Sequence, residues 1–227
     1  MGIQTSIVAL AAVASAATAS FDIQVTEMWM GNEPGANLTE DWFEVTNFGT
    51  SDFTFGVDGY LFFDDNSADP SVADLMQGIG TIAAGETVVF VDEGSGGALG
   101  FFNTWYPGGG TPGAGGIPQI GFYDGSGLGQ GGDAVALFLG ATDNFEDLVA
   151  GDLIDLESYP DADANGGQSW DVVLGGFSTV GNASGAFSTA LANDEGQFAI
   201  ASPGTIPTPG ALAIIGLGGL AAARRRR

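Results

Sequence analysis

The sequence predicts an all-β protein, built as a sandwich or a barrel of short strands. Glycine makes up 39 of its 227 residues, and the chain is also rich in Asp, Asn, Thr, Phe and Val. Segments that alternate β-branched or aromatic residues with polar ones are bounded by turn-forming residues, as half-buried strands are. No long window places apolar residues at helical spacing. Seven or more short strands with glycine-rich connections are typical of a sandwich or a barrel.

Three segments in the first third of the chain carry the clearest alternation. They are residues 23–30, 42–47 and 60–63. In the second segment, Phe43 and Val45 are two positions apart and share a face, which we expect to be interior. Trp42 points the other way, so we expect it to be covered by a loop or to lie partly exposed beside Glu44. Replacing Glu44 with Gln is then expected to cost well under about 1 kcal/mol, as at most surface positions.

Four further strands are expected, at residues 86–92, 119–122, 133–139 and 148–154. The glycine-dominated run 108–116 is expected to form a surface loop. It does not fit a phosphate-binding loop, because no Lys follows it and no helix opens there. After Gly132, the Asp133 side chain is expected to cap backbone amides in a turn, and Asn47 is expected to do the same after its strand.

Acidic residues dominate the charge of the chain. All 28 Asp and Glu lie between Asp22 and Glu195, the only basic residues are four C-terminal arginines, and the formal net charge is −24. Nucleic acids are excluded as partners, because their phosphates are bound through Lys and Arg, whereas cations are favoured. A hydrophobic content of 44% argues against disorder. The absence of Cys excludes disulfides and thiol chemistry.

The residue types also exclude most catalytic chemistry. The chain has no His and no Cys, so it cannot form Ser-His or Cys-His arrangements, or imidazole or thiolate metal sites. Two carboxylates remain as a catalytic pair, and Glu27 and Glu44 are candidates for neighbouring strands. So many acidic residues produce such pairs by chance. We therefore expect a protein without enzymatic activity.

Residues 1–19 are expected to be a removable signal peptide. Residues 3–14 form an apolar run, and Ala17-Thr18-Ala19 fits the small-residue pattern of a signal-peptidase site, with cleavage before Ser20. The first four residues lack the usual Lys or Arg. The pattern predicts export.

Residues 206–227 are expected to be a second signal. Its marks are a proline-containing entry, an apolar stretch over residues 211–223 and a terminal basic cluster. The residues that form the entry and the cluster are Pro207, Thr208, Pro209, Gly210, Arg224, Arg225, Arg226 and Arg227. A helix over the apolar stretch rises about 20 Å, short of the roughly 30 Å hydrocarbon core, so we expect transient membrane association. The arginines favour the cytoplasmic side, which leaves the preceding body outside.

This three-part layout resembles the PEP-CTERM sorting signal of Gram-negative bacteria, in which Glu usually stands at the position of Thr208. The resemblance implies processing by a membrane protease of the exosortase type. It also implies a location at the cell surface, in the outer membrane or in the extracellular matrix. A simple tail anchor or a frayed apolar end is the alternative.

A second resemblance covers residues 21–205. The segment Asp41-Trp42-Phe43-Glu44-Val45-Thr46-Asn47 is similar to the "E-W-I-E-L-Y-N" element of lamin tail domains. Other similar segments follow the family's order, at residues 27–28, 61–66, 82–91, 127–138, 167–170 and 202–204. The resemblance implies an immunoglobulin-like β-sandwich, and the bacterial members of the family are mostly extracellular accessory or surface modules. A fold alone does not give a function.

One loop has the spacing of a calcium site. Asp161, Asp163 and Asn165, followed by Gly166, have the D-x-D-x-N-G order that places oxygen ligands around Ca²⁺. Val172 stands where an EF-hand has its bidentate Glu. The alternative is an acidic loop closed by Asp side chains with no ion. Ca²⁺ is the only cofactor that the sequence suggests.

These observations predict one domain, residues 20–205, between two removable segments. We expect an exported, non-enzymatic surface or matrix protein of structural or interaction type. The first alternative is a Ca²⁺-dependent adhesion or carbohydrate-binding module, with exposed Trp29 or Trp105 as the platform for surface glycans. The second is a hydrolase that uses carboxylates alone.

Overall fold

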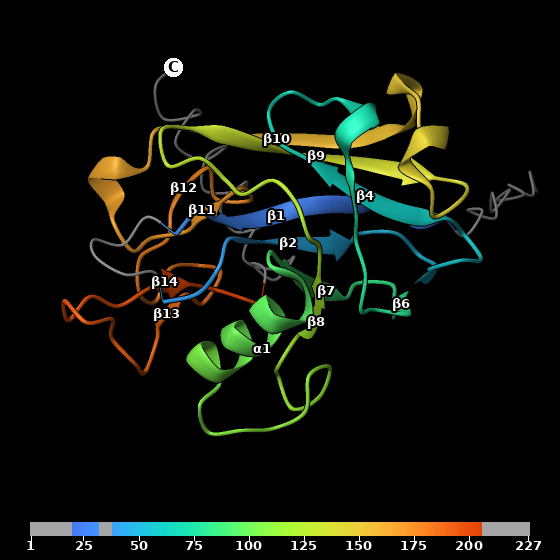
Figure 1. Cartoon of the computed structure of the whole chain (residues 1–227). Helices are drawn as coiled ribbons and strands as arrows, with labels where there is room; N and C mark the ends of the chain where they lie inside the picture. Colours follow the sequence, from blue (N-terminus) through green and yellow to red (C-terminus); the bar gives the residue numbers. More distant parts are fainter. Residues whose placement is uncertain (1–19, 32–37, 206–227) are drawn as a thin grey trace, which may run out of the picture.

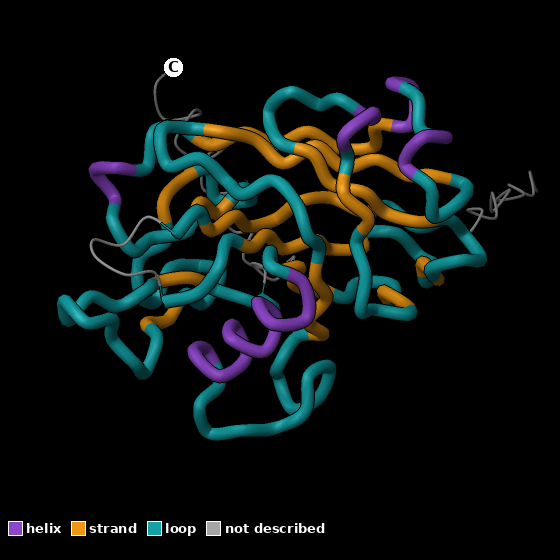
Figure 2. Tube along the Cα trace, viewed as in Figure 1, coloured by secondary structure: helices purple, strands orange, loops and turns teal. Residues whose placement is uncertain are grey.

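The computed structural model describes residues 20–31 and 38–205. In these residues the protein consists mostly of β-strands in several sheets, with one α-helix. The two larger sheets face each other, and the helix lies on the far side of the larger one (Figure 1). Long loops join the strands, most of all near the chain end (Figure 2). The all-β class expected from the sequence is confirmed at this level.

The larger sheet has six strands in the order β12-β11-β1-β2-β7-β8. Their bounds, in sheet order, are Gly176–Phe177, Trp170–Asp171, Ile23–Trp29, Trp42–Asn47, Thr87–Val91 and Gln119–Phe122. Neighbouring strands are antiparallel except β7 and β8, which are parallel. The register between β1 and β2 shifts between Val25 and Glu27. This bulge decides which side chains of β1 face the helix, because an extra residue reverses the alternation of faces.

The smaller sheet has four strands in the order β10-β9-β4-β5. Their bounds are Leu153–Tyr159, Asp133–Gly140, Tyr60–Asp64 and Asp74–Leu75. Two further pairs are short: β3 (Phe53–Thr54) with β6 (Thr81–Ile82), and β13 (Phe187–Ser188) with β14 (Ile200–Ala201). The 3-10 turns η1 to η4 are Pro70–Val72, Phe145–Asp147, Ala150–Asp152 and Asp163–Asn165.

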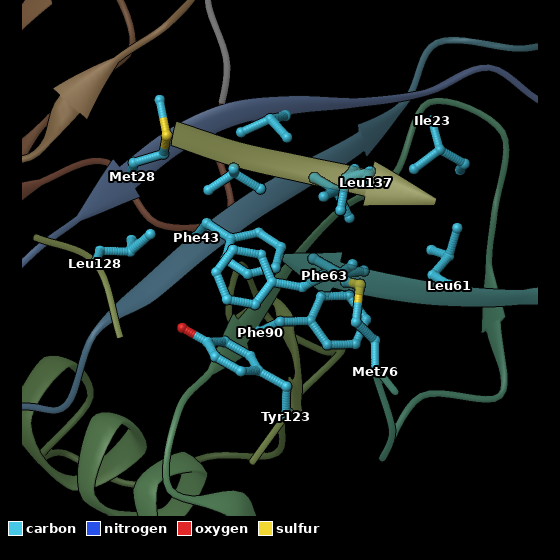
Figure 3. Packing of buried hydrophobic residues seen from close by; sticks show 14 of the residues in the cluster. Ile23, Met28, Phe43, Leu61, Phe63, Met76, Phe90, Tyr123, Leu128 and Leu137 are labelled. Carbon is cyan, nitrogen blue, oxygen red and sulfur yellow. The ribbon is translucent and has the colours of Figure 1, made fainter. Parts of the chain in front are cut away.

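The main core fills the space between the two larger sheets. The Phe43 ring of β2 lies 5.0 Å from Phe63 of β4 and 5.4 Å from Tyr123, measured between ring centroids (Figure 3). Phe43 and Val45 are fully buried in this cluster. The expectation that these two residues point inside is confirmed.

A second apolar cluster lies on the outer face of the six-stranded sheet, beneath α1 (Gly94–Trp105). Phe101 and Trp105 of the helix pack edge-on against Trp42, at centroid distances of 5.4 and 6.0 Å. Trp42 is thus fully buried under a helix, and the expectation of a covering loop or partial exposure was wrong. The helix was missed because its sequence, GSGGALGFFNTW, is glycine-rich and has only a narrow apolar stripe. Docking of its rings on the sheet stabilises it, as tertiary packing does for many weak helices.

The expected strand at residues 148–154 was wrong in its placement. Residues 150–152 form η3, and β10 starts at Leu153. The Asp152 carboxylate accepts a hydrogen bond from the Val149 amide at 2.8 Å. Such local side-chain bonds compete with strand pairing and close a turn instead. The other six expected strands match observed strands to within about two residues at each end.

The expected turn contacts are confirmed. The Asp133 carboxylate accepts the amides of Gly129 at 2.7 Å and Asn66 at 3.2 Å. The Asn47 side-chain oxygen accepts the amide of Gly49 at 3.0 Å. Residues 108–116 form an exposed loop.

The expected signal peptide, with Ala17 and Ala19, and the expected sorting segment, residues 206–227, lie outside the described residues. Within residues 20–31 and 38–205, no helix has both the length and the apolar character needed to cross a bilayer.

Candidate functional site

Three carboxylates lie in a row on the outer face of the six-stranded sheet. Glu27 of β1 is directly opposite Glu44 of β2 on one side and Asp171 of β11 on the other. Their side chains are 1%, 0% and 2% exposed. The bulge after Val25 is what turns Glu27 to this face, since Val25 itself points into the main core. Opposite residues of antiparallel strands have Cβ atoms about 5 Å apart, so these acidic groups are close neighbours.

Glu27 collects hydrogen bonds from three serines. Its Oε1 accepts the hydroxyls of Ser169 at 2.5 Å, Ser178 at 3.2 Å and Ser202 at 3.1 Å. It also accepts the Ser202 amide at 3.0 Å, and Oε2 accepts the same amide at 3.1 Å. Residue 202 is 175 positions away along the chain, so this one carboxylate joins the first strand to the last described segment.

Glu44 and Asp171 bind the surrounding chain in the same manner. Glu44 Oε1 accepts the Thr26 hydroxyl at 2.7 Å, and Oε2 accepts the Gly204 amide at 2.6 Å. Asp171 accepts the Leu174 amide at 2.9 Å and the Ser184 hydroxyl. The expectation that Glu44 lies at the surface was wrong, because residues 202–204 cover it.

The electrostatics of this cluster follow from burial with no basic side chain among the residues that the structure describes. Burial raises the pKa of Glu27 from 4.5 to about 7, and the negative charge of Asp171 adds to this, while the bonds from Ser169 and Ser202 oppose it. Burial, and next the charge of Glu27, raise the pKa of Glu44 well above its ordinary value. No Lys, Arg or His occurs before Arg224 to offset these charges.

The hydroxyl of Tyr106, the residue that follows α1, completes the cluster. It donates to the carbonyl of Pro203 at 3.1 Å, between the two residues held by Glu27 and Glu44. Burial, followed by the charges of Glu44 and Glu27, raises the pKa of Tyr106 above its ordinary value of 10.0. The hydroxyl therefore stays protonated and remains a donor.

The role of this cluster is structural: its hydrogen bonds hold residues 202–204 against the six-stranded sheet. The expected proximity of Glu27 and Glu44 is confirmed by their register. Their oxygens, however, face serine and threonine hydroxyls and backbone amides, under a covering segment, and both side chains are buried. Among the described residues, no group of three or more Asp or Glu has an arrangement suited to a metal ion.

The expected calcium loop is a turn on the surface. The Asp161 carboxylate accepts the Asp163 amide at 2.9 Å, and η4 runs over Asp163–Asn165. Asp161 and Asp163 are exposed, whereas Ala162 between them is buried. The Asp161 bond is the one that an ion-free loop closed by an Asp side chain would make. Calcium binding at Asp161, Asp163 and Asn165 stays a prediction.

Calcium binding can be separated from general charge screening. We expect the midpoint of thermal unfolding to rise with NaCl, because salt screens the acidic surface. Millimolar Ca²⁺ at constant ionic strength should add a further rise if the loop binds it, since a ligand of the folded state stabilises that state. Asp163→Ala should abolish only the Ca²⁺ increment, while Asp143→Ala, at another exposed loop position, should retain it. Equal Ca²⁺ responses in Asp163→Ala and the unaltered protein would contradict specific binding.

The tryptophans expected as a sugar platform are interior. Trp29 is 0% and Trp105 is 3% exposed, and their rings lie 6.3 Å apart in the cluster beneath the helix. Neither ring can stack on a glycan in this fold. The carbohydrate-binding alternative therefore loses the two side chains on which it was based.

The residues that matter most in this cluster were not singled out from the sequence. Ser169, Ser178 and Ser202 are small polar residues in separate segments, and only the fold brings them to Glu27. Comparisons of the chain with protein-family models, with curated proteins and with solved structures find no match.

Proposed function

We propose that this is an exported, non-enzymatic protein of the cell surface or extracellular matrix, a structural or interaction module on an immunoglobulin-like sandwich. A signal peptide directs export, and an exosortase-type enzyme processes residues 206–227 in a Gram-negative-type bacterium. The module is then found at the cell surface, in the outer membrane or in the matrix.

The observation that carries this proposal is that Glu27, Glu44 and Tyr106 hold residues 202–204 by hydrogen bonds. These bonds lie directly before the expected sorting segment and hold the last part of the folded body against the sheet. A folded module that is cut or anchored at its end needs a firm last contact, because the end of a domain otherwise frays. The described residues between 20 and 205 form a core of their own between two larger sheets.

The resemblance to lamin tail domains gains support from the same place. Glu27, Glu44, Ser169 and Ser202 all lie in segments that resemble elements of that family. These segments are far apart in the sequence, yet in the fold they meet in one hydrogen-bonded cluster. The four segments thus share a structural role in this fold, and their relationship to the family remains part of the proposal.

Processing at both ends is directly testable. Protein extracted from cells is expected to start at Ser20 and to lack Arg224 to Arg227, because both terminal segments carry the marks of removable signals. Intact-mass spectrometry of the extracted protein should therefore give a value below the 22.9 kDa of the full chain, once attached glycans are removed. Recovery of chains that still end at Arg227 would leave a simple tail anchor instead.

A further inference from the structure

The last described segment, residues 199–205, is held on the outer sheet face by backbone pairing over residues 199–201 and by side chains of other elements beyond them. The Ile200 amide donates to the Gly167 carbonyl at 2.7 Å, and the Ile200 carbonyl accepts the Ser169 amide at 3.1 Å. The Ala199 carbonyl accepts the Thr189 amide at 2.9 Å, and β14 itself has two residues. Beyond Ala201, the contacts are the bonds to Glu27, Glu44 and Tyr106, together with a bond from the Thr205 hydroxyl to the Ser184 carbonyl at 2.6 Å.

The contacts that the segment makes with Glu27 and Glu44 depend on the protonation of these two carboxyl groups. The titratable groups around the segment are Glu27 from β1, Glu44 from β2, Asp171 from β11, Tyr106 after α1 and Glu86 before β7, which lines the same surface hollow as Gly204 and Thr205. When Glu27 and Glu44 are both ionised, two negative charges stand on opposite residues of neighbouring strands and are shielded from water. One proton on the pair removes that repulsion, and so does release of the segment, because water then reaches both carboxylates.

Release of the segment leaves the main core in place. The cluster between the two sheets contains no residue beyond Phe177 among those described. Ala199 and Ala201 belong instead to the cluster beneath α1, with Trp42 and Trp105. The segment can therefore separate from the body as a local event, of the kind that opens below the free energy of global unfolding.

We propose that Glu27 and Glu44 form a proton-dependent latch, which holds residues 199–205 closed while the pair keeps a proton and opens more readily as the pH rises towards neutral. If the proposed sorting function holds, release lengthens the tether between the folded body and the sorting segment. Seven residues add up to about 23 Å of extended chain. The latch would then set how far the body stands from its processing or anchoring point.

Hydrogen exchange of single amides in the full chain tests the latch. Exchange rates are measured by NMR between pH 5 and pH 8 and divided by the intrinsic rates to give protection factors. Protection of the Ser202 and Gly204 amides is expected to fall by up to about tenfold per pH unit up to near pH 7, and to level off above it. Amides in the β2–β7 pairing should stay more strongly protected at every pH, because opening of the segment leaves the main core in place.

Glu44→Gln is the matched test of the charge. The Gln oxygen can accept the Gly204 amide, and its NH₂ can donate to the Thr26 hydroxyl, so both contacts survive without a charge. This variant is expected to protect Gly204 more than the unaltered protein does at pH 8, because one buried charge is gone, whereas Glu146→Gln, at an exposed position, should behave like the unaltered protein. Tyr106→Phe removes the bond to Pro203 without changing a charge on the pair. It should lower protection equally at each pH and keep the slope.

Three results would overturn the latch. The first is constant protection of Ser202 and Gly204 between pH 5 and pH 8. The second is equal protection of Ser202, Gly204 and the β2–β7 amides at every pH, which would mean that the segment opens only with global unfolding. The third is protection of Gly204 at pH 8 that is no higher in Glu44→Gln than in the unaltered protein or, if that variant fails to fold, an unchanged slope in Glu27→Gln. None of these measurements involves export or cleavage, so a failure of the processing test leaves the latch standing, and the reverse also holds.

Discussion

Replacing Phe43 with Ala is expected to lower the free energy of unfolding by about 3 to 5 kcal/mol, as truncation of a fully buried aromatic does. The ring sits at the centre of the core between the sheets, with Phe63, Phe90 and Tyr123 around it. No neighbour can fill the space without shifting one of the two sheets. Urea unfolding followed by circular dichroism measures the change.

Phe48→Ala provides the matched control for this substitution. Phe48 lies just after the same strand but is 43% exposed, so its removal is expected to cost about 1 kcal/mol or less. If both substitutions cost the same, the assignment of inner and outer faces on β2 is wrong.

The stability of the protein is expected to fall as the pH rises from about 4.5 to about 7. The sign follows from the carboxyl pair. The pKa of Glu27 is 4.5 when solvated and about 7 in the fold, so the folded state binds a proton that the unfolded state has lost. The stabilisation is complete below about pH 4.5 and disappears as the pH passes 7. The difference is on the order of 3 kcal/mol, and urea midpoints at a series of pH values measure it.

Glu44→Gln separates this effect from repulsion across the whole acidic surface. The variant is expected to be nearly neutral at pH 5 and to stabilise the protein by about 1 to 3 kcal/mol at pH 8, because one buried charge is gone and its hydrogen bonds can be kept. This expectation replaces the near-zero effect predicted for a surface position. Glu146→Gln should leave the pH profile unchanged. A profile that is flat from pH 5 to pH 8 in the unaltered protein would mean that the pair ionises at no cost.

Local patterns in the sequence predicted most of the strands, and the reason is physical. The alternation over Trp42–Asn47 depends only on near neighbours, and it gave the bounds of β2 and the inward direction of Phe43. The environment of the opposite face of β2 could not be read in this way. Whether Trp42 and Glu44 meet solvent depends on α1 and on residues 202–204, which are distant in the sequence.

The burial of the carboxylate cluster was even harder to predict from the sequence. That Glu27 and Glu44 could be neighbours followed from placing both on adjacent strands. That they are buried depends on the bulge after Val25 and on hydroxyls supplied by Ser169 and Ser202. Single serines carry no periodic signal, so their convergence appears only when the chain is folded.

The buried carboxylates have no basic partners, and the body of the protein also lacks the residues after which trypsin-like proteases cleave. Glu27, Glu44 and Asp171 are held by amides and hydroxyls and not by lysine or arginine, which do not occur before Arg224. Trypsin-like proteases cleave only after those two residues. The body from Ser20 to Thr205 therefore offers them no cleavage site, either folded or fully unfolded. Its resistance to such enzymes is a property of the covalent chain and persists when the fold is lost.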